Sequence, residues 1–316
     1  MREQLRETWA GRRIALCGTD TGLARWTQAL LGALGADVCA PESGLGGWSG
    51  GALRDALTRH QAQVWICAGL PRAHTLLMAR EALALLSDSF AMARACGVRC
   101  MLLMLDDSAY RDADAPWGCR EGDPLGGRSA DGFSQSCMRL LAEGFRAGHW
   151  GGPLPMVIAH YGARALTCAG PAQAWLEALV RGEPPSLPEE TMPFQHPLEV
   201  AGGALLAAGR ALLLPLHGGD TWNFGAPAQG WLSPRLALRT LAQASGLPCG
   251  ETYPRSPVTP RSTRLDSEKA RRHLGWRTVY DAEDALRLLA AQTRDPDGAY
   301  ATQTGAYLQE LGRPQS

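Results

Sequence analysis

One histidine and one tyrosine close a predicted strand and are suited to proton transfer. His160 and Tyr161 end the apolar run at 154–161, and in an open parallel sheet ligands bind outside the carboxyl ends of the strands. A histidine beside a phenol could act there as a general acid and base. The alternative is that both rings pack in the core or at its rim, and the sequence leaves both interpretations open.

A glycine-containing turn follows the first predicted strand and is suited to a phosphate. After the apolar run at 13–17 the pattern G-x-x-x-G-x-A begins at Gly18, and such a turn directs backbone N–H groups and a helix dipole at a pyrophosphate. Asp20 counts against this use, because a carboxylate 4 Å from a phosphate costs roughly 4 kcal/mol at an effective dielectric of 20. Arg25 could offset part of that repulsion. The candidate cofactor residues are Gly18, Thr19, Asp20, Gly22, Ala24 and Arg25.

The cysteines predict neither disulfides nor a metal centre. The chain has 9 of them, scattered and without a C-x-x-C pair, which favours buried reduced thiols. Zinc would require Cys and His clustered at ligand spacing, so no metal is expected. Cys137 as a nucleophile is less favoured than Cys137 as a small buried apolar residue.

Composition excludes several classes of partner. Lys+Arg and Asp+Glu are both 31 among the 316 residues, so the formal net charge is +0, and neither nucleic acid nor an acidic membrane is favoured as a partner. The first residues are charged, and no signal peptide is apparent. The apolar stretch at 204–216 is interrupted and too short to cross a bilayer. The sequence therefore predicts a cytoplasmic protein.

Apolar runs alternate with amphipathic stretches along the chain, which predicts an α/β fold with a doubly wound parallel sheet. Strands are expected at 13–17, 37–40, 63–68, 98–105 and 154–161. Helices are expected at 23–34, 52–60, 79–96, 130–146, 197–214, 281–292 and 302–311, with a surface loop at 181–192.

Four segments resemble one known family. WGCREGDPLGG at 117–127, PFQHPLE at 193–199, TWNFG at 221–225 and LDSEKARRHLGW at 265–276 are similar to the WGYREDDPLGG, PWQHVLE, AWNFG and LDxSKAxxxLGW segments of CDP-glucose 4,6-dehydratases. They occur in the family's order and at nearly its spacing, so the resemblance covers nearly the whole chain. It places the sequence with the extended short-chain dehydrogenases/reductases (SDRs).

The resemblance implies a two-part architecture. A Rossmann-like dinucleotide-binding domain is expected over 1–165, with 194–250 partly returning to it. A smaller substrate lobe is expected from 166–193 and 251–316. The family also implies a homodimer through the helices that begin near Ala79 and Ala130.

The family reaction requires a Tyr and a Lys in a Y-x-x-x-K helix, and this sequence departs from that pattern. In the family, bound NAD takes a hydride from the sugar C4, water leaves across C5 and C6, and the hydride returns. Its DPYSASKA segment aligns with 131–138, where Phe133 stands at the Tyr position and Cys137 at the Lys position. A phenyl ring carries no exchangeable proton, and a positioned acid or base contributes about 10² to 10⁴ in rate.

Other family positions are altered as well. The family's VTSDKCY aligns with 104–110, so Leu105 replaces the Thr, while Asp107 and Tyr110 survive. Asp107 could still assist dehydration, or Asp106 and Asp107 could be a solvated pair. Met192 replaces the Arg that precedes PWQH, although Arg is well suited to a diphosphate.

The retained residues imply a substrate cleft formed by Phe194, Gln195, His196 and Asn223, although Gln195 and His196 could equally anchor the C-terminal lobe. NAD is the cofactor that the resemblance implies, and Asp20 argues against its retention. The family's acidic residue for the adenine, expected near 47–51, is also missing.

Two functions remain open. In the first, the chain is a non-redox pseudoenzyme or accessory subunit in a sugar or natural-product pathway. It would bind a nucleotide sugar or another small molecule and form a homodimer or a hetero-oligomer with a pathway enzyme. In the second, it is a lyase, isomerase or cyclase that uses Asp107, Tyr110, His160 or Tyr161 without hydride transfer. An active CDP-glucose 4,6-dehydratase is the least favoured interpretation.

Overall fold

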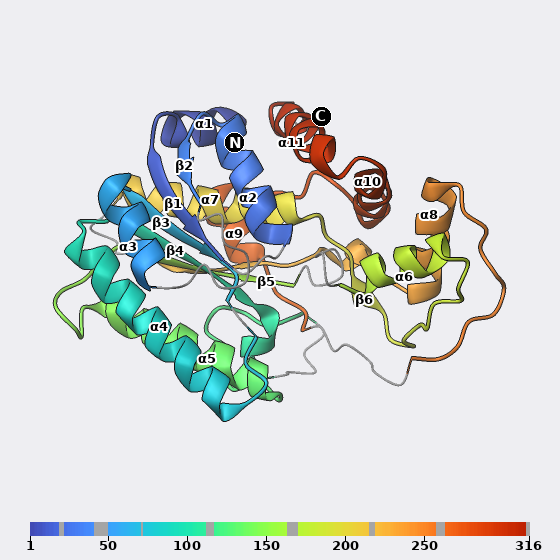
Figure 1. Ribbon diagram of the computed structural model, residues 1–316, viewed down its shortest axis with the longest axis horizontal. Helices are drawn as coiled ribbons and strands as arrows, with labels where there is room; N and C mark the ends of the chain where they lie inside the picture. The colour runs from blue at the N-terminus through green and yellow to red at the C-terminus, as the bar shows by residue number, and fades with distance from the viewer. Residues whose placement is uncertain are drawn as a thin grey trace.

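The computed structural model describes residues 1–18, 22–40, 50–70, 72–111, 117–162, 170–214, 219–256 and 263–313. A parallel sheet forms its centre, helices cover both faces of this sheet, and a smaller group of helices lies beyond its carboxyl edge (Figure 1).

The central sheet has six strands in the order β2-β1-β3-β4-β5-β7, and every pairing in it is parallel. The strands are β1 (Arg13–Cys17), β2 (Asp37–Cys39), β3 (Val64–Ala68), β4 (Cys100–Asp106), β5 (Met156–Tyr161) and β7 (Thr221–Phe224). β3, β4 and β5 are buried along their whole length, as expected for strands covered on both faces. The predicted α/β class with a doubly wound sheet is confirmed.

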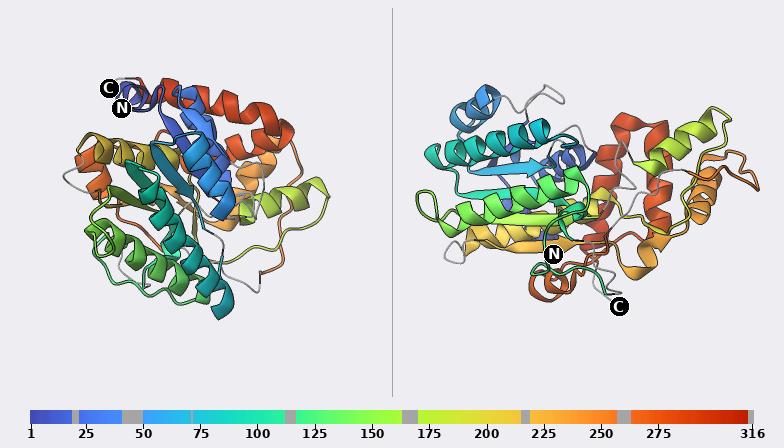
Figure 2. Two further views of the ribbon diagram at one scale, coloured as in Figure 1. Left: turned by 60° about the vertical axis from the view of Figure 1, so that its left-hand side comes forward. Right: turned by 90° about the horizontal axis from the view of Figure 1, so that it is seen from below.

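Two layers of helices enclose this sheet (Figure 2). One layer shares a core cluster with β1, β4 and β7 and contains α1 (Arg2–Trp9), α2 (Gly22–Ala33), α7 (Pro197–Leu213), α9 (Glu268–Leu274) and α11 (Pro296–Leu311). The other layer contains α3 (Gly50–Arg59), α4 (Leu76–Ala95) and α5 (Ala130–Ala147).

A separate apolar cluster forms the smaller lobe. It contains α6 (Pro171–Val180), α8 (Pro234–Ser245) and α10 (Ala282–Arg294). The two-stranded antiparallel sheet of β6 (Met192–Pro193) and β8 (Trp231–Leu232) borders it. In this packing α8 belongs to the smaller lobe, while α9 and α11 pack on the main core. At these three helices the expected domain limits differ from the observed packing.

Two helices that the sequence did not predict, α6 and α8, carry local start signals, as does the early start of α11. α6 and α8 both have proline in their first turn, and Ser233 caps α8 by accepting the N–H of Leu236. α11 begins at Pro296, six residues before the expected start, where the Asp295 side chain accepts the N–H of Gly298. Proline at the first helical position and a capping Ser or Asp are common start signals.

α4 and α5 pack side by side and present apolar side chains outward. Leu76 and Leu77 on α4 are 87% and 56% exposed, and Leu140 on α5 is 57% exposed. The expected homodimer through these helices stays a prediction. Among the described residues, no helix combines the length and hydropathy needed to cross a bilayer.

Gly18 is required by the close approach of β1 and β3. A Cβ at this position would lie 2.6 Å from the carbonyl oxygen of Ala68, whereas a Cβ at Gly32, within α2, would meet nothing within 4 Å. We therefore expect Gly18→Ala to lower the free energy of unfolding by about 2 kcal/mol or more, because backbone atoms must move apart.

Gly32→Ala is the matched control. It should raise the free energy of unfolding by up to about 1 kcal/mol, because alanine favours the helix. Urea unfolding of both variants measures the difference, and equal effects would contradict this account of the Gly18 contact.

Candidate functional site

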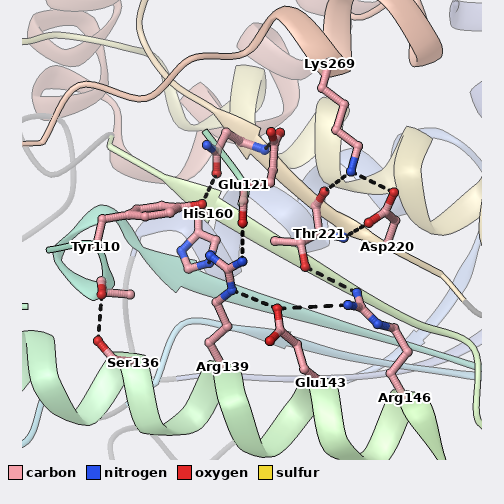
Figure 3. Close-up of polar contacts among 12 residues, drawn as sticks. Tyr110, Glu121, Ser136, Arg139, Glu143, Arg146, His160, Asp220, Thr221 and Lys269 are labelled. Atoms are coloured by element: carbon pink, nitrogen blue, oxygen red, sulfur yellow. Dashed lines mark hydrogen bonds and ion pairs between the residues drawn. The ribbon is translucent and has the colours of Figure 1, made fainter. Parts of the chain in front are cut away.

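The turn that follows β4 is locked to the start of α5. A Cβ at Gly127 or Gly132 would lie 2.0 Å or 2.5 Å from the carbonyl oxygen of Ser108. The Ser136 hydroxyl of α5 donates to the carbonyl of Ala109 at 2.6 Å (Figure 3). These contacts fix the position and rotation of α5 against the sheet, and with it the direction of its other side chains.

Phe133 and Cys137 lie one turn apart on α5, a spacing that places them on the same face of the helix. Phe133 is 61% exposed, and Cys137 is half-buried. A phenyl ring has no ionisable proton, and a thiol is a weaker donor than an ammonium group. At these two positions α5 therefore offers neither a phenol nor a cation.

A buried polar network joins α5 to β5 and β7 (Figure 3). The Tyr110 hydroxyl donates to Oδ1 of Asn223 at 2.8 Å, and the Tyr110 ring centre lies 4.8 Å from that of His160. The Arg139 guanidinium stands 5.4 Å from the Tyr110 ring centre and 3.4 Å from Nε2 of His160. Two predicted catalytic residues, Tyr110 and His160, are thus together, but in the interior. Tyr161 instead packs in the core on the α7 side.

Burial determines the protonation of this network. Burial, and then the charge of Arg139, lowers the pKa of His160 to about 3, so its ring is neutral at pH 7. Burial raises the pKa of Tyr110, although Arg139 and the hydrogen bond to Asn223 act in the opposite direction. A neutral imidazole can accept a hydrogen bond from Arg139 through Nε2. As arranged, these groups compensate the buried charge of Arg139.

The carboxylates at the end of β4 are buried, which corrects the expectation of a solvated pair. Asp106 is 8% and Asp107 1% exposed. Oδ1 of Asp106 accepts the N–H of Ser108 at 2.8 Å, and Oδ2 of Asp107 accepts the N–H of Thr263 at 2.8 Å. Asp107 therefore ties the turn after β4 to the segment that leads into α9. Leu105 is fully buried in the core on the α5 side.

Side chains cover the outer edge of β7, which has no neighbouring strand in the described sheet. Glu121 Oε1 accepts the N–H of Asn223 at 2.9 Å, and Lys269 Nζ donates to the carbonyl of Thr221 at 2.8 Å. Lys269 also pairs with Asp220 at 2.7 Å and lies 4.6 Å from the ring centre of Trp222. Lys269 is the only lysine in the chain. Its ammonium group is thus held at the start of β7.

The glycine turn leaves β1 where the strand order of the sheet reverses, which is where dinucleotides bind in such folds. Gly18 follows β1, Gly22 is buried as the first residue of α2, Ala24 is half-buried and Arg25 is exposed. The first turn of α2 contains no acidic residue. The predicted residues Thr19 and Asp20 lie outside the described residues, as does most of the 47–51 segment.

A pocket of about 230 Å³ opens beside this turn, between the two lobes. Gly22 and Arg25 contribute a helix N-terminus and a guanidinium group, and Trp26 and Tyr300 contribute aromatic rings. These groups fit a phosphate joined to a planar group, and so the phosphate-bearing part of NAD.

The predicted cleft residues 194–196 are buried at the junction of the lobes. Phe194 packs in the core of the smaller lobe. Nε2 of His196 lies 2.9 Å from Oε1 of Gln303 on α11, and burial lowers the pKa of His196 to about 4. The Gln195 amide is buried, and no hydrogen-bond partner for it is found among the described residues. Asn223 lies apart from these residues in the β7 network, so the predicted set is not brought together.

Comparisons with known proteins agree with this geometry at the level of the fold. No family model matches the sequence. CDP-glucose 4,6-dehydratase from Salmonella typhimurium is 24% identical over 209 residues, which cover 60% of this chain and 56% of that protein. The match therefore spans little more than half of that relative's length.

Solved structures match over most of the chain. UDP-glucose 4-epimerase from Thermus thermophilus, solved with NAD, superposes with a TM-score of 0.72 at 15% identity, covering 89% of this chain and 99% of that one. dTDP-glucose 4,6-dehydratase from Streptomyces venezuelae, also solved with NAD, gives 0.68 at 14% identity over 90% and 98%. The fold is that of the extended SDRs. The resemblance seen in the sequence is confirmed at this level.

The sequence analysis did not assign roles to Arg139, Glu121 and Lys269, which organise the β7 side of the site. Arg139 could have been found as a charge on the inward side of an amphipathic helix, since it lies four residues before Glu143 and pairs with it at 3.0 Å. Lys269 could have been found by counting, because a chain with one lysine can contain only one Lys-dependent motif. No group of three or more His, Cys, Asp or Glu among the described residues is arranged to hold a metal.

Glu199, near the start of α7, makes the stability depend on pH. Its Oε1 accepts the N–H groups of Val279 and Tyr280 at 2.8 Å each, and burial raises its pKa to about 8. The pKa of Glu199 is higher in the folded than in the unfolded chain. Its contribution to the stability of the fold is therefore complete below about pH 4.5 and is lost as the pH rises towards 8. We expect the free energy of unfolding to fall by on the order of 2 kcal/mol between pH 6 and 8.

Glu199→Gln is the matched variant, because its amide oxygen can still accept both N–H groups. Denaturant unfolding at a series of pH values should show a flatter profile for this variant. A wild-type profile that is equally flat over this interval would show that Glu199 is not the titrating group.

Proposed function

We propose that this chain is a nucleotide-sugar-binding protein of SDR fold that does not carry out hydride transfer. It would act as a non-redox pseudoenzyme or accessory subunit in a sugar or natural-product biosynthetic pathway. The proposal joins two separate properties, a retained ligand cleft and a missing proton relay, and each can be tested alone.

The position of the single lysine is the main support for the missing proton relay. In the resembling dehydratases a lysine four residues after a tyrosine holds the nicotinamide ribose and lowers the pKa of the phenol. Here the only lysine, Lys269, is committed to Asp220 and Thr221. The α5 residue that shares Thr221 with it is Arg146, at 3.2 Å. Arg146 lies nine residues after Cys137, about 13 Å along the helix.

No other described group restores the relay. Phe133 occupies the position of the tyrosine, and Tyr110, the nearest phenol in chain order, donates its hydrogen bond to Asn223 in the interior. Leu105 is buried where the family has a threonine. The losses concern one reaction step, while the contacts that hold α5 and β7 in place are kept. This pattern supports a protein that kept its fold and lost its redox step.

The pocket beside α2 supports the first property. It combines a helix N-terminus, Arg25 and two aromatic rings in about 230 Å³, which suits a phosphate joined to a base. The relatives described above are named for reactions of CDP-, UDP- and dTDP-glucose. A nucleoside diphosphate or its sugar is therefore the ligand class proposed for this chain.

A second candidate is a lyase, isomerase or cyclase that reuses the cleft without a hydride. The observation that favours it is Asp107, a carboxylate only 1% exposed at the carboxyl end of β4, where ligands of this fold bind. Against it stands the bond from the Thr263 N–H to Oδ2 of Asp107, which gives that oxygen a structural role. Conversion of a CDP-sugar by protein that carries no bound NAD, with none added, would favour this candidate.

The missing relay predicts a negative assay. With CDP-glucose and added NAD, purified protein should form no 4-keto-6-deoxy product above a boiled sample, because neither Phe133 nor Cys137 can move the required proton. Chromatography of the sugar nucleotides measures this, with an active CDP-glucose 4,6-dehydratase as the positive control. Product that scales with protein concentration would refute the non-redox assignment.

The retained cleft predicts nucleotide binding. At a CDP concentration 100-fold above its Kd the protein should be stabilised by about 2.7 kcal/mol, which corresponds to a rise in Tm of roughly 5 °C. Arg25→Gln should reduce this rise, because the guanidinium group in the pocket lining would pair with the phosphate. Arg59→Gln on α3, an exposed position outside the pocket, is the control. No rise with CDP, or equal rises in both variants, would argue against this cleft.

A further inference from the structure

A second pocket lies at the outer edge of β7, between α7 and α9. Its volume is about 320 Å³, which is within the range of small-molecule sites. Trp222, Ala207 and Ala211 form an apolar floor, and all three are buried. Arg210 of α7 and His273 of α9 stand at its rim. The pocket is thus apolar inside and basic at its entrance.

The charged groups at this pocket are not fully neutralised by each other. Lys269 and Asp220 form an ion pair at 2.7 Å, so together they add no net charge. Arg210 donates from one nitrogen to the carbonyl of His273 at 3.2 Å, which is a neutral partner. A guanidinium group has five N–H donors, so Arg210 keeps donors and a full charge for an incoming anion.

The chemistry of the floor restricts the size and shape of that anion. Trp222 is only 4% exposed, and the Lys269 ammonium lies 4.6 Å from its ring centre, while Leu214, also in the pocket lining, is 43% exposed. A ligand would therefore contact Leu214 and the small residues Ala207 and Ala211 of α7 rather than the face of the indole. A small apolar body with one acidic group would match both this lining and the rim.

This pocket is separate from the cleft proposed for nucleotides. It borders β7, and the glycine turn follows β1, which lies four strands away in the sheet. Four strand spacings amount to about 19 Å, more than the length of a small planar ligand. The groups that line the two pockets are also entirely different.

We infer that the β7-edge pocket, formed by Arg210, Trp222, Lys269 and His273, is a second ligand site that binds a small planar apolar anion, such as an aromatic carboxylate or sulfonate. Arg210 takes the acidic group, and the apolar body lies against Leu214 and the small residues of α7. Binding at this site depends neither on the proposed nucleotide cleft nor on any catalytic activity of the protein.

The test is a calorimetric titration of the protein with 1-naphthalenesulfonate, which gives the Kd of the probe. Arg210→Gln should weaken binding about tenfold, the effect of losing one charge-assisted contact. Arg239→Gln on α8 is the matched control, since it removes an exposed arginine from the other lobe, and it should leave the Kd unchanged. The uncharged 1-naphthalenemethanol should bind about tenfold more weakly than the sulfonate.

The single lysine gives an independent readout. With an amine-reactive reagent the only expected sites are Lys269 and the amino group of Met1, and mass spectrometry distinguishes them. Bound 1-naphthalenesulfonate should slow the labelling of Lys269 severalfold relative to Met1, which serves as the internal reference. Adding saturating CDP should not displace the probe.

Three outcomes would overturn the inference. The first is no measurable binding at millimolar probe. The second is equal weakening by Arg210→Gln and Arg239→Gln. The third is displacement by CDP, which would place the probe in the nucleotide cleft. A failure to bind CDP alone, with the other results as expected, would count against the proposed function and leave the β7-edge pocket intact.

Discussion

Compensation of the Arg139 charge is the constraint on which the rest of the site depends. A guanidinium group that is only 5% exposed would be costly to bury without partners. Its partners come from four separate places: Glu143 on its own helix, the ring of His160 on β5, the ring of Tyr110 after β4, and the carbonyl of Glu121. Each of these segments is therefore held where the charge requires it.

The constraint continues to the edge of the sheet. Glu121, whose carbonyl receives Arg139, uses its carboxylate to bind the N–H of Asn223. Asn223 in turn accepts from Tyr110 and donates to the carbonyl of Cys119. Side chains thus bind backbone groups of β7 that a neighbouring strand would otherwise pair with, and they cover this edge of the sheet. Tyr110 and Asn223, which the sequence suggests as site residues, thus form part of the network that supports β7.

Much of the fold could be predicted from the sequence, because β1, β3, β4 and β5 are short apolar runs between polar turns. β1 and β5 lie within the expected runs, Gly18 follows β1, and Gly22 begins α2. α1 could not be predicted, because only Leu5, Thr8 and Trp9 of its eight residues are buried. These are too few to show the hydrophobic periodicity of a helix.

The site could be predicted only in part, because residue type does not reveal burial. The sequence pairs His160 with Tyr161 and gives Tyr110 as a further candidate, whereas in the structure His160 lies beside Tyr110. Burial lowers the pKa of His160 and raises that of Tyr110. Asp106 and Asp107 are buried rather than solvated, because backbone N–H groups of Ser108 and Thr263 compensate them. Such compensation depends on loops that are distant in sequence and have no periodic pattern.

The single lysine has a consequence for how the chain can be cut. A protease specific for lysine has one peptide bond to attack, between Lys269 and Ala270, and that bond lies within α9. Cleavage inside a helix requires local unfolding, and Ala270, Leu274 and Trp276 are buried against the main core. The rate of this one cut would therefore report how often α9 detaches from β7, a local opening free energy measured without any label.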